Sequence, residues 1–232
     1  MIQVRNLFFK HEEYFVLTDI NLEIKEGSFT AIIGANGCGK STLAKHFNGL
    51  LLPTKGDVIV DEINTRKNQV EIRKKVGLVF QDFQDQIVYP IAQEDVAFGL
   101  ENLGLPEAHI KKIVNETLEK LKIKKLANSN VNTLSLGQKQ LIALAGVLAM
   151  RPKYIVFDEP TTMLDGVNKK NILSIIKELN EKEKLTIILI TNVLDDLRYA
   201  KRIVVLKEGK IIFNDRKELL DKKILSEAQL YV

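Results

Sequence analysis

The sequence has 232 residues, of which 45% are hydrophobic and 28% are charged, a balance typical of a globular chain with one large core. The net charge of +4 is spread as short Lys/Arg pairs among acidic residues. A nucleic-acid-binding surface would cluster that charge, so we expect no nucleic-acid partner. The single cysteine, Cys38, excludes an internal disulfide and a multi-cysteine zinc site.

The sequence shows no signal for membrane insertion or secretion. The longest uncharged apolar stretch, around Leu141–Met150, is too short to cross a bilayer. The first residues are typical of a strand and lack the apolar core of a signal peptide. We therefore expect a cytoplasmic protein, for which any role at a membrane requires a partner that spans it.

The predicted elements change character along the chain. Apolar patterning predicts strands at Ile2–Phe9, Ile20–Ile24, Thr30–Ile33, Asp57–Asp61 and Val76–Phe80. Helical spacing follows from about Ile87 to Leu126, and strands and helices then alternate, with strands at Tyr154–Phe157, Thr186–Ile190 and Ile203–Leu206 and a helix from about Val167. This order predicts one α/β domain over residues 1–232, with an antiparallel β subdomain and an inserted α-helical subdomain at about 87–150.

A phosphate-binding loop follows the strand Thr30–Ile33. The segment "GANGCGKST" matches G-x-x-x-x-G-K-[ST], and a helical run, Leu43–Leu50, comes after it. Backbone N–H groups of such a loop surround a phosphate, Lys40 bridges the β- and γ-phosphates, and the Ser41 hydroxyl ligates Mg²⁺. The predicted phosphate-binding residues are Gly34, Ala35, Asn36, Gly37, Cys38, Gly39, Lys40, Ser41 and Thr42. For Cys38 we favour a compact filler over a redox sensor.

A second motif, "YIVFDEP", is an apolar strand that ends in two carboxylates, Asp158 and Glu159. Neighbouring side chains on a strand point to opposite sides, so the two acids have different roles. We predict that Asp158 holds Mg²⁺, and that Glu159 polarises the water that attacks the γ-phosphate.

The later motifs resemble the signatures of ABC-type ATPases. "LSLGQKQ" at 134–140 precedes "FDEPTTMLD" at 157–165, and "VFQ" at 79–81 is similar to the family's Q-loop. The resemblance covers essentially the whole chain and implies a P-loop NTPase fold of the ABC type, with ATP and Mg²⁺ as ligands. It also implies a dimer that holds two ATP molecules, in which this chain's signature contacts the ATP of a second ABC ATPase subunit.

Individual roles are carried over from the same resemblance. Gln81 corresponds to the Q-loop glutamine, which touches Mg²⁺ and relays to a transmembrane subunit. Ser135, Gly137 and Gln138 belong to the signature, and Asp165 falls on the D-loop aspartate. His11 matches the position that stacks on adenine, although an exposed loop histidine is an equally good reading.

"TTMLD" and "FQDFQDQIV" are similar to the energy-coupling-factor (ECF) transporter ATPases, although residues 82–85 depart from their Q-loop pattern. This likeness implies two further partners, a transmembrane coupling subunit and a substrate-binding membrane subunit, and a place at the cytoplasmic face of the membrane. Many ECF ATPases extend beyond the position of Val232, so we expect their C-terminal dimerisation region to be largely missing. We also expect some of Phe83, Tyr89 and Phe98 to line an apolar groove for a membrane partner; the alternative places all three in the core.

Two substitutions depart from the family pattern. Leu136 replaces the first signature glycine, and Asn192 stands where the family has its switch histidine. An amide can donate a hydrogen bond to a γ-phosphate, but it carries no charge and reaches less far than an imidazole. We therefore expect an asymmetric heterodimer, in which this chain's own site binds ATP and hydrolyses it slowly. The alternative is a regulatory ATP-binding module whose partner does the hydrolysis.

Overall fold

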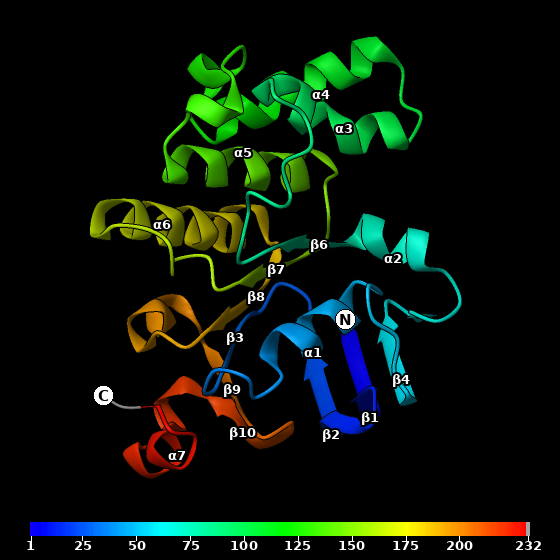
Figure 1. Cartoon of the computed structure of the whole chain (residues 1–232), viewed down its shortest axis with the longest axis vertical. Coiled ribbons are helices and arrows are strands. Elements are labelled where there is room, and N and C mark those ends of the chain that lie inside the picture. The colour runs from blue at the N-terminus through cyan, green and yellow to red at the C-terminus, as the bar shows by residue number, and fades with distance from the viewer. Residues whose placement is uncertain (231–232) are drawn as a thin grey trace.

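The computed structural model describes residues 1–230, and its elements form two sheets and a separate group of helices (Figure 1). The smaller sheet is antiparallel, with the strand order β2-β1-β4-β5. Its strands are β1 (Ile2–His11), β2 (Tyr14–Ile24), β4 (Lys55–Val60) and β5 (Ile63–Asn64). Ile2 and Val4 of β1 lie opposite Val60 and Val58 of β4, and these four side chains are buried on one face.

The larger sheet has the order β10-β9-β3-β8-β7-β6. Its strands are β3 (Phe29–Ile33), β6 (Val76–Val79), β7 (Tyr154–Asp158), β8 (Thr186–Thr191), β9 (Arg202–Lys207) and β10 (Lys210–Arg216). All neighbours pair in parallel except β10, which pairs antiparallel with β9 at the edge. Along β8, Ile187 and Leu189 enter one core while Ile188 and Ile190 enter the other. Continuous apolar runs therefore mark these strands, because both faces are covered.

Helices cover the two faces of the larger sheet. Figure 1 shows α3, α4 and α5 grouped at the end of the molecule opposite β1 and β2, whereas α1 lies near the smaller sheet. The helices are α1 (Lys40–Phe47), α2 (Gln69–Lys75), α3 (Ala92–Asn102), α4 (Glu107–Lys120), α5 (Leu136–Ala149), α6 (Gly166–Glu183) and α7 (Lys222–Glu227). The predicted α/β class, with an antiparallel sheet and a helical insertion, is confirmed.

Several predicted boundaries were wrong. Strand β2 begins at Tyr14 rather than Ile20, because β1 pairs with it over its whole length. Helix α1 begins at Lys40 and ends at Phe47, whereas the sequence predicted Leu43–Leu50. Strand β4 begins at Lys55 rather than Asp57 and includes Gly56. A Cβ at Gly56 would lie 2.0 Å from the carbonyl oxygen of Asn6, so the close approach of two strands requires glycine there.

Helix α2 was not predicted, because it buries a single apolar side chain, Ile72, and so has no apolar periodicity. Its start is fixed instead by Asn68, which accepts a hydrogen bond from the Glu71 N–H at 3.0 Å. Strand β10 was also missed. No helix among residues 1–230 is both long enough and apolar enough to cross a bilayer.

Candidate functional site

The predicted phosphate loop connects β3 to α1. Gly39, at the helix N-cap, has φ 105°, and a Cβ there would lie 2.9 Å from the Leu17 side chain. A side chain at Gly34 would meet the Leu206 carbonyl oxygen at 2.2 Å and the Cys38 sulfur at 2.6 Å. The loop therefore requires glycine where strands β2 and β9 press against it. Cys38 is buried, and this burial raises the pKa of its thiol, as expected for a filler rather than a reactive group.

Lys40 occupies the middle of the loop. Its ammonium donates hydrogen bonds to the carbonyl oxygens of Gly34 at 2.9 Å and Ala35 at 3.0 Å. It also lies 3.9 Å from a carboxylate oxygen of Glu159, and both side chains are almost fully buried. A buried cation held among backbone oxygens is placed to receive an anion such as a phosphate.

Asp158 and Ser41 meet where β7 ends beside α1. The Ser41 hydroxyl donates to Asp158 at 3.0 Å, and burial raises the pKa of the Asp158 carboxyl group. No cluster of three or more His, Cys, Asp or Glu side chains in the described part of the chain could hold a metal ion. Mg²⁺ bound to nucleotides needs only one or two oxygen ligands from the protein, with water and phosphate supplying the others. The pair therefore fits the predicted magnesium site.

Glu159 projects from a strained turn. Its φ is 47°, in the left-handed region, and its N–H donates to the Ile190 carbonyl oxygen of β8 at 2.9 Å. The carboxylate accepts hydrogen bonds from the Gln81 amide at 3.3 Å and from the Thr162 hydroxyl at 3.2 Å. Such backbone strain persists only where the surroundings hold it, and it is common at functional sites.

Asn192 follows β8 and faces the phosphate loop. Its amide nitrogen donates to the side-chain oxygen of Asn36 at 2.8 Å. These groups meet at a pocket of about 340 Å³, which we call the phosphate pocket. It is lined by Val16, Asn36, Gly37, Gly39, Lys40, Ser41, Thr42, Gln81, Glu159, Thr162 and Asn192. Val16 and Thr162 were not predicted. Thr162 stands directly in the "DEPTT" run, whereas Val16 comes from the distant strand β2.

The signature residues and Asp165 lie outside this pocket. Ser135 caps α5 and forms a reciprocal capping box with Gln138. A Cβ on Gly137 would lie 2.7 Å from the side-chain oxygen of Asn168, whose amide donates to Asp165 at 2.8 Å. The start of the signature helix and the start of α6 thus pack directly against each other, while Leu136 is 43% exposed.

The aromatic predictions had mixed outcomes. Phe83 is buried, so a partner cannot reach it. Tyr89 is exposed and packs edge-on against the half-buried Phe98, with the ring centres 5.7 Å apart. His11 is exposed at the tip of the β1–β2 hairpin, opposite Tyr14, and is not among the residues that line the phosphate pocket.

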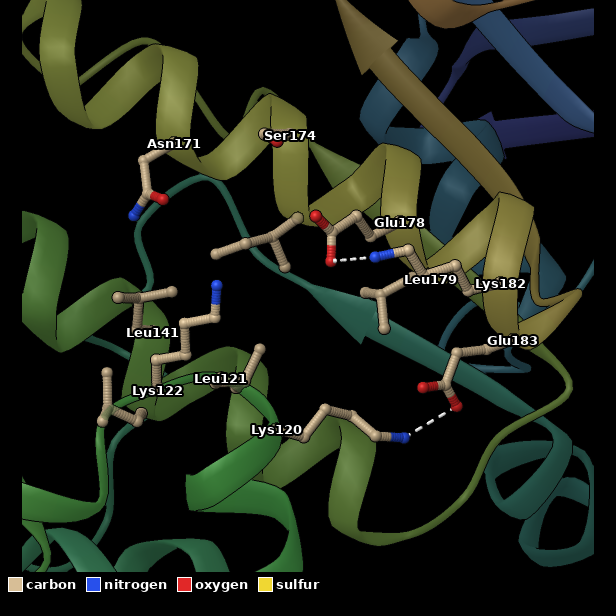
Figure 2. A pocket seen from close by; sticks show the side chains of 12 residues that line it. Lys120, Leu121, Lys122, Leu141, Asn171, Ser174, Glu178, Leu179, Lys182 and Glu183 are labelled. Carbon is tan, nitrogen blue, oxygen red and sulfur yellow. Dashed lines mark hydrogen bonds and ion pairs between the residues drawn. The ribbon is translucent and has the colours of Figure 1, made fainter.

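A different pocket, of about 270 Å³, lies between the helical group and α6 (Figure 2). Leu121, Leu141 and Leu179 contribute its apolar part, and ion pairs Lys120–Glu183 and Lys182–Glu178 lie at its edge. None of the predicted site residues lines it. The predicted phosphate-loop residues gather instead at the pocket at the start of α1.

Comparison with known proteins identifies the family of the chain. Residues 17–162 match the family model described as ABC transporter. The energy-coupling factor transporter ATP-binding protein EcfA1 of Caldanaerobacter subterraneus subsp. tengcongensis is 46% identical over 211 residues, which cover 90% of this chain and 76% of that protein.

Two solved structures are also similar. CbiO1 of Clostridium perfringens, described as part of the ABC transporter complex cbiONQ, has a TM-score of 0.87 and 36% identity, covering 100% of this chain and 95% of that one. The ATP-binding cassette MJ0796, a dimer in a post-hydrolysis state with ADP and Pi, has a TM-score of 0.82 and 33% identity, covering 93% of this chain and 98% of that one.

The fold and the phosphate pocket thus define an ATP-binding cassette with the groups needed for hydrolysis. The chain belongs to the ABC transporter family and is similar to its ECF-type ATP-binding proteins. It is an ABC-type ATPase that binds ATP.

Proposed function

We propose that this chain couples ATP binding and hydrolysis to substrate uptake by an ECF-type membrane transporter, as one half of an asymmetric ATPase heterodimer. The names of its relatives support the transporter assignment: one is an ECF transporter ATP-binding protein, and another is part of the cbiONQ complex. The partners would be a second ABC ATPase, a transmembrane coupling subunit and a substrate-binding membrane subunit. The chain would then work at the cytoplasmic face of the membrane.

The groups of the phosphate pocket supply the steps of hydrolysis. Lys40 would neutralise the β- and γ-phosphates, and Ser41 and Asp158 would hold Mg²⁺, which would supply further positive charge at the phosphates. Glu159 orients and polarises the attacking water, and its contact with Gln81 links it to the Q-loop. Glu159 is retained, which supports a site that still performs chemistry.

Asn192 is the observation that carries the asymmetry. It lines the same pocket as Lys40 and Glu159, and its amide is engaged with Asn36 of the phosphate loop. An amide is uncharged at every pH, so it cannot add positive charge near the γ-phosphate as an imidazolium can. Loss of one well-placed donor at developing charge costs about 10²–10³ in rate. The chain's own site is therefore the slow one.

The other composite site would use this chain's signature. Ser135 and Gly137 contact the ATP that the second ATPase holds, and Gln138 and Asp165 support that surface. Leu136 points outward and does not disturb the capping box of α5. The second site can thus remain fast even though this chain departs from the family pattern at two positions.

The experiment is Asn192→His in the assembled complex, with the hydrolytic glutamate of the second ATPase replaced by glutamine. Turnover then reports this chain's own site, and we expect it to rise by about 10-fold or more. Asn102→His, at an exposed position, is the control for a histidine introduced elsewhere. Brisk hydrolysis by the unmodified chain alone would contradict the asymmetry. No rise would favour a regulatory ATP-binding module, whose own site is limited by something other than Asn192.

A further inference from the structure

Asp196 is a fully buried carboxylate that does not line the phosphate pocket. It lies in a short 3₁₀ helix, Leu194–Tyr199, that follows Asn192, and its exposure is 0%. Removing a charged group from water is costly unless partners replace the lost hydration. The partners of Asp196 therefore indicate its role.

One oxygen of Asp196 joins two segments of the phosphate pocket. It accepts a hydrogen bond from the Thr161 hydroxyl and another, at 3.1 Å, from the Thr191 hydroxyl. Thr161 stands two residues after Glu159, and Thr191 directly precedes Asn192. Both threonines are buried. A single atom thus fixes the turn after Glu159 relative to the end of β8.

The turn that carries Asn192 is held from both sides by the same contacts. The Thr191 oxygen, which donates its proton to Asp196, also accepts a hydrogen bond from the Val193 N–H at 2.9 Å. Asn192 lies between these two residues, so its backbone follows the position of the Thr191 side chain. Glu159 depends on the same region, because its N–H donates to the carbonyl oxygen of Ile190.

The second oxygen of Asp196 reaches a third segment. It lies 3.0 Å from the Lys169 ammonium, in an ion pair without hydrogen-bond geometry. Lys169 stands in the first turns of α6, where its N–H donates to the carbonyl oxygen of Asp165, the helix N-cap, at 2.9 Å. The Lys169 side chain is 23% exposed, so it connects the buried carboxylate of Asp196 to the surface near Asp165.

We propose that Asp196 is a positioning residue for ATP hydrolysis, which sets Asn192 and the Glu159 turn relative to each other and ties both to the start of α6 through Lys169. Asp196 is fully buried and does not line the phosphate pocket, so it acts through its neighbours. Movement of α6, for example when a second ATPase engages Asp165, would then shift both groups together. This last consequence rests on the proposed heterodimer, whereas the positioning role requires only the ATPase activity of the family.

The decisive variants change Lys169 rather than the buried carboxylate. Lys169→Met keeps side-chain length at a partly exposed helix position but leaves Asp196 without its cation. We expect turnover per site to fall about 10-fold, because small misplacements of reacting groups have effects of this size. ATP affinity should stay within about two-fold, because neither residue lines the pocket. Lys169→Arg keeps the positive charge, so its turnover should stay near that of the unmodified chain. Lys170→Met, at the exposed neighbouring position, is the matched control.

A double-mutant cycle adds a second readout. Asp196→Asn removes the charge that Lys169 neutralises, so Lys169→Met should cause no further loss of turnover in the Asp196→Asn background. Single-turnover hydrolysis in the assembled complex, ATP affinity and melting temperature are measured for each variant. Loss of turnover with unchanged affinity, rescue by arginine and non-additivity support the proposal.

Two results would overturn the positioning role. The first is equal turnover in Lys169→Met and Lys170→Met. The second is a turnover that falls only in step with ATP affinity and melting temperature, without rescue by arginine. Failure of the asymmetric heterodimer would be seen separately. It concerns the absolute rate of the unmodified site, whereas the positioning role is measured as a ratio between variants.

Discussion

The phosphate pocket and the signature region differ in how far each is completed within one chain. In the pocket, side chains from distant segments already contact one another, as Lys40, Gln81 and Glu159 do. In the signature region, the hydrogen bonds of Ser135 among residues 1–230 stay within its own helix start, and Leu136 beside it is exposed. One region brings its groups together within the chain, and the other presents a preformed, exposed surface. This contrast supports the proposed dimer, in which the two chains share their sites.

Loss of Lys40 tests the assembled region most severely. Lys40→Ala removes the buried cation that faces the phosphates, so we expect the ATP affinity of the isolated chain to fall at least about 100-fold. Lys139→Ala changes a lysine of the signature helix and should leave that affinity unchanged. Equilibrium binding of a fluorescent ATP analogue measures both. Near-native affinity in Lys40→Ala would refute the phosphate-loop assignment.

A methyl group at Gly137 tests the preformed region. In Gly137→Ala the new Cβ would lie 2.7 Å from the Asn168 side chain, so the signature must shift away from α6. We expect ATP binding by the isolated chain to be unchanged and turnover of the complex to fall about 10-fold. Gly146→Ala, in the same helix, is the control, because its Cβ would meet only the Asp95 carbonyl oxygen at an ordinary 3.9 Å. Equal turnover in the two variants would contradict a role for Gly137 at the interface.

The smallest expected effect is on the stability of the chain, and it comes from Asp158 in the assembled region. Burial raises the pKa of Asp158, so the folded chain binds this proton more tightly than the unfolded chain does. The free energy of unfolding therefore falls as the pH rises above the ordinary aspartate range and the buried carboxyl group becomes charged. Asparagine stays uncharged, so Asp158→Asn should stabilise the nucleotide-free chain at neutral pH by about 0.5–2 kcal/mol.

Thermal melting between about pH 4 and pH 7 measures this effect, because an unperturbed aspartate titrates near the lower limit. The advantage of Asp158→Asn should grow with pH. With Mg²⁺ and ATP the order should reverse, since the variant lacks the carboxylate predicted to hold the ion. An advantage that does not change with pH would show that Asp158 is not destabilised by burial.

The sequence predicted those parts of the molecule whose signals are local. The phosphate loop and the strand ending in Asp158 and Glu159 are short patterns with a fixed geometry, and the structure places both at one pocket. The parallel strands were recognisable because both of their faces are buried. Phe83 shows the limit: its place just after the Q-loop suggested a surface groove, but tertiary packing buries it.

Other features depend on residues far apart in the chain. Val16 reaches the phosphate pocket only because β2 pairs with β1 and passes beside Gly39. Asp196 is one of two neighbouring aspartates after Asn192, and nothing local distinguishes it from Asp195. Its importance comes from Thr161 and Lys169, which lie 35 and 27 positions earlier and meet it only in the folded chain.

The buried position of Cys38 has a practical consequence for spectroscopy. Its thiol is covered by the phosphate loop and protonated at neutral pH, so thiol reagents should leave the folded protein unmodified. Cys38 is also the chain's single cysteine. A cysteine introduced at the exposed Met163 would thus be the one accessible thiol of the protein. A spin label or fluorophore could be attached there without altering the loop that holds ATP.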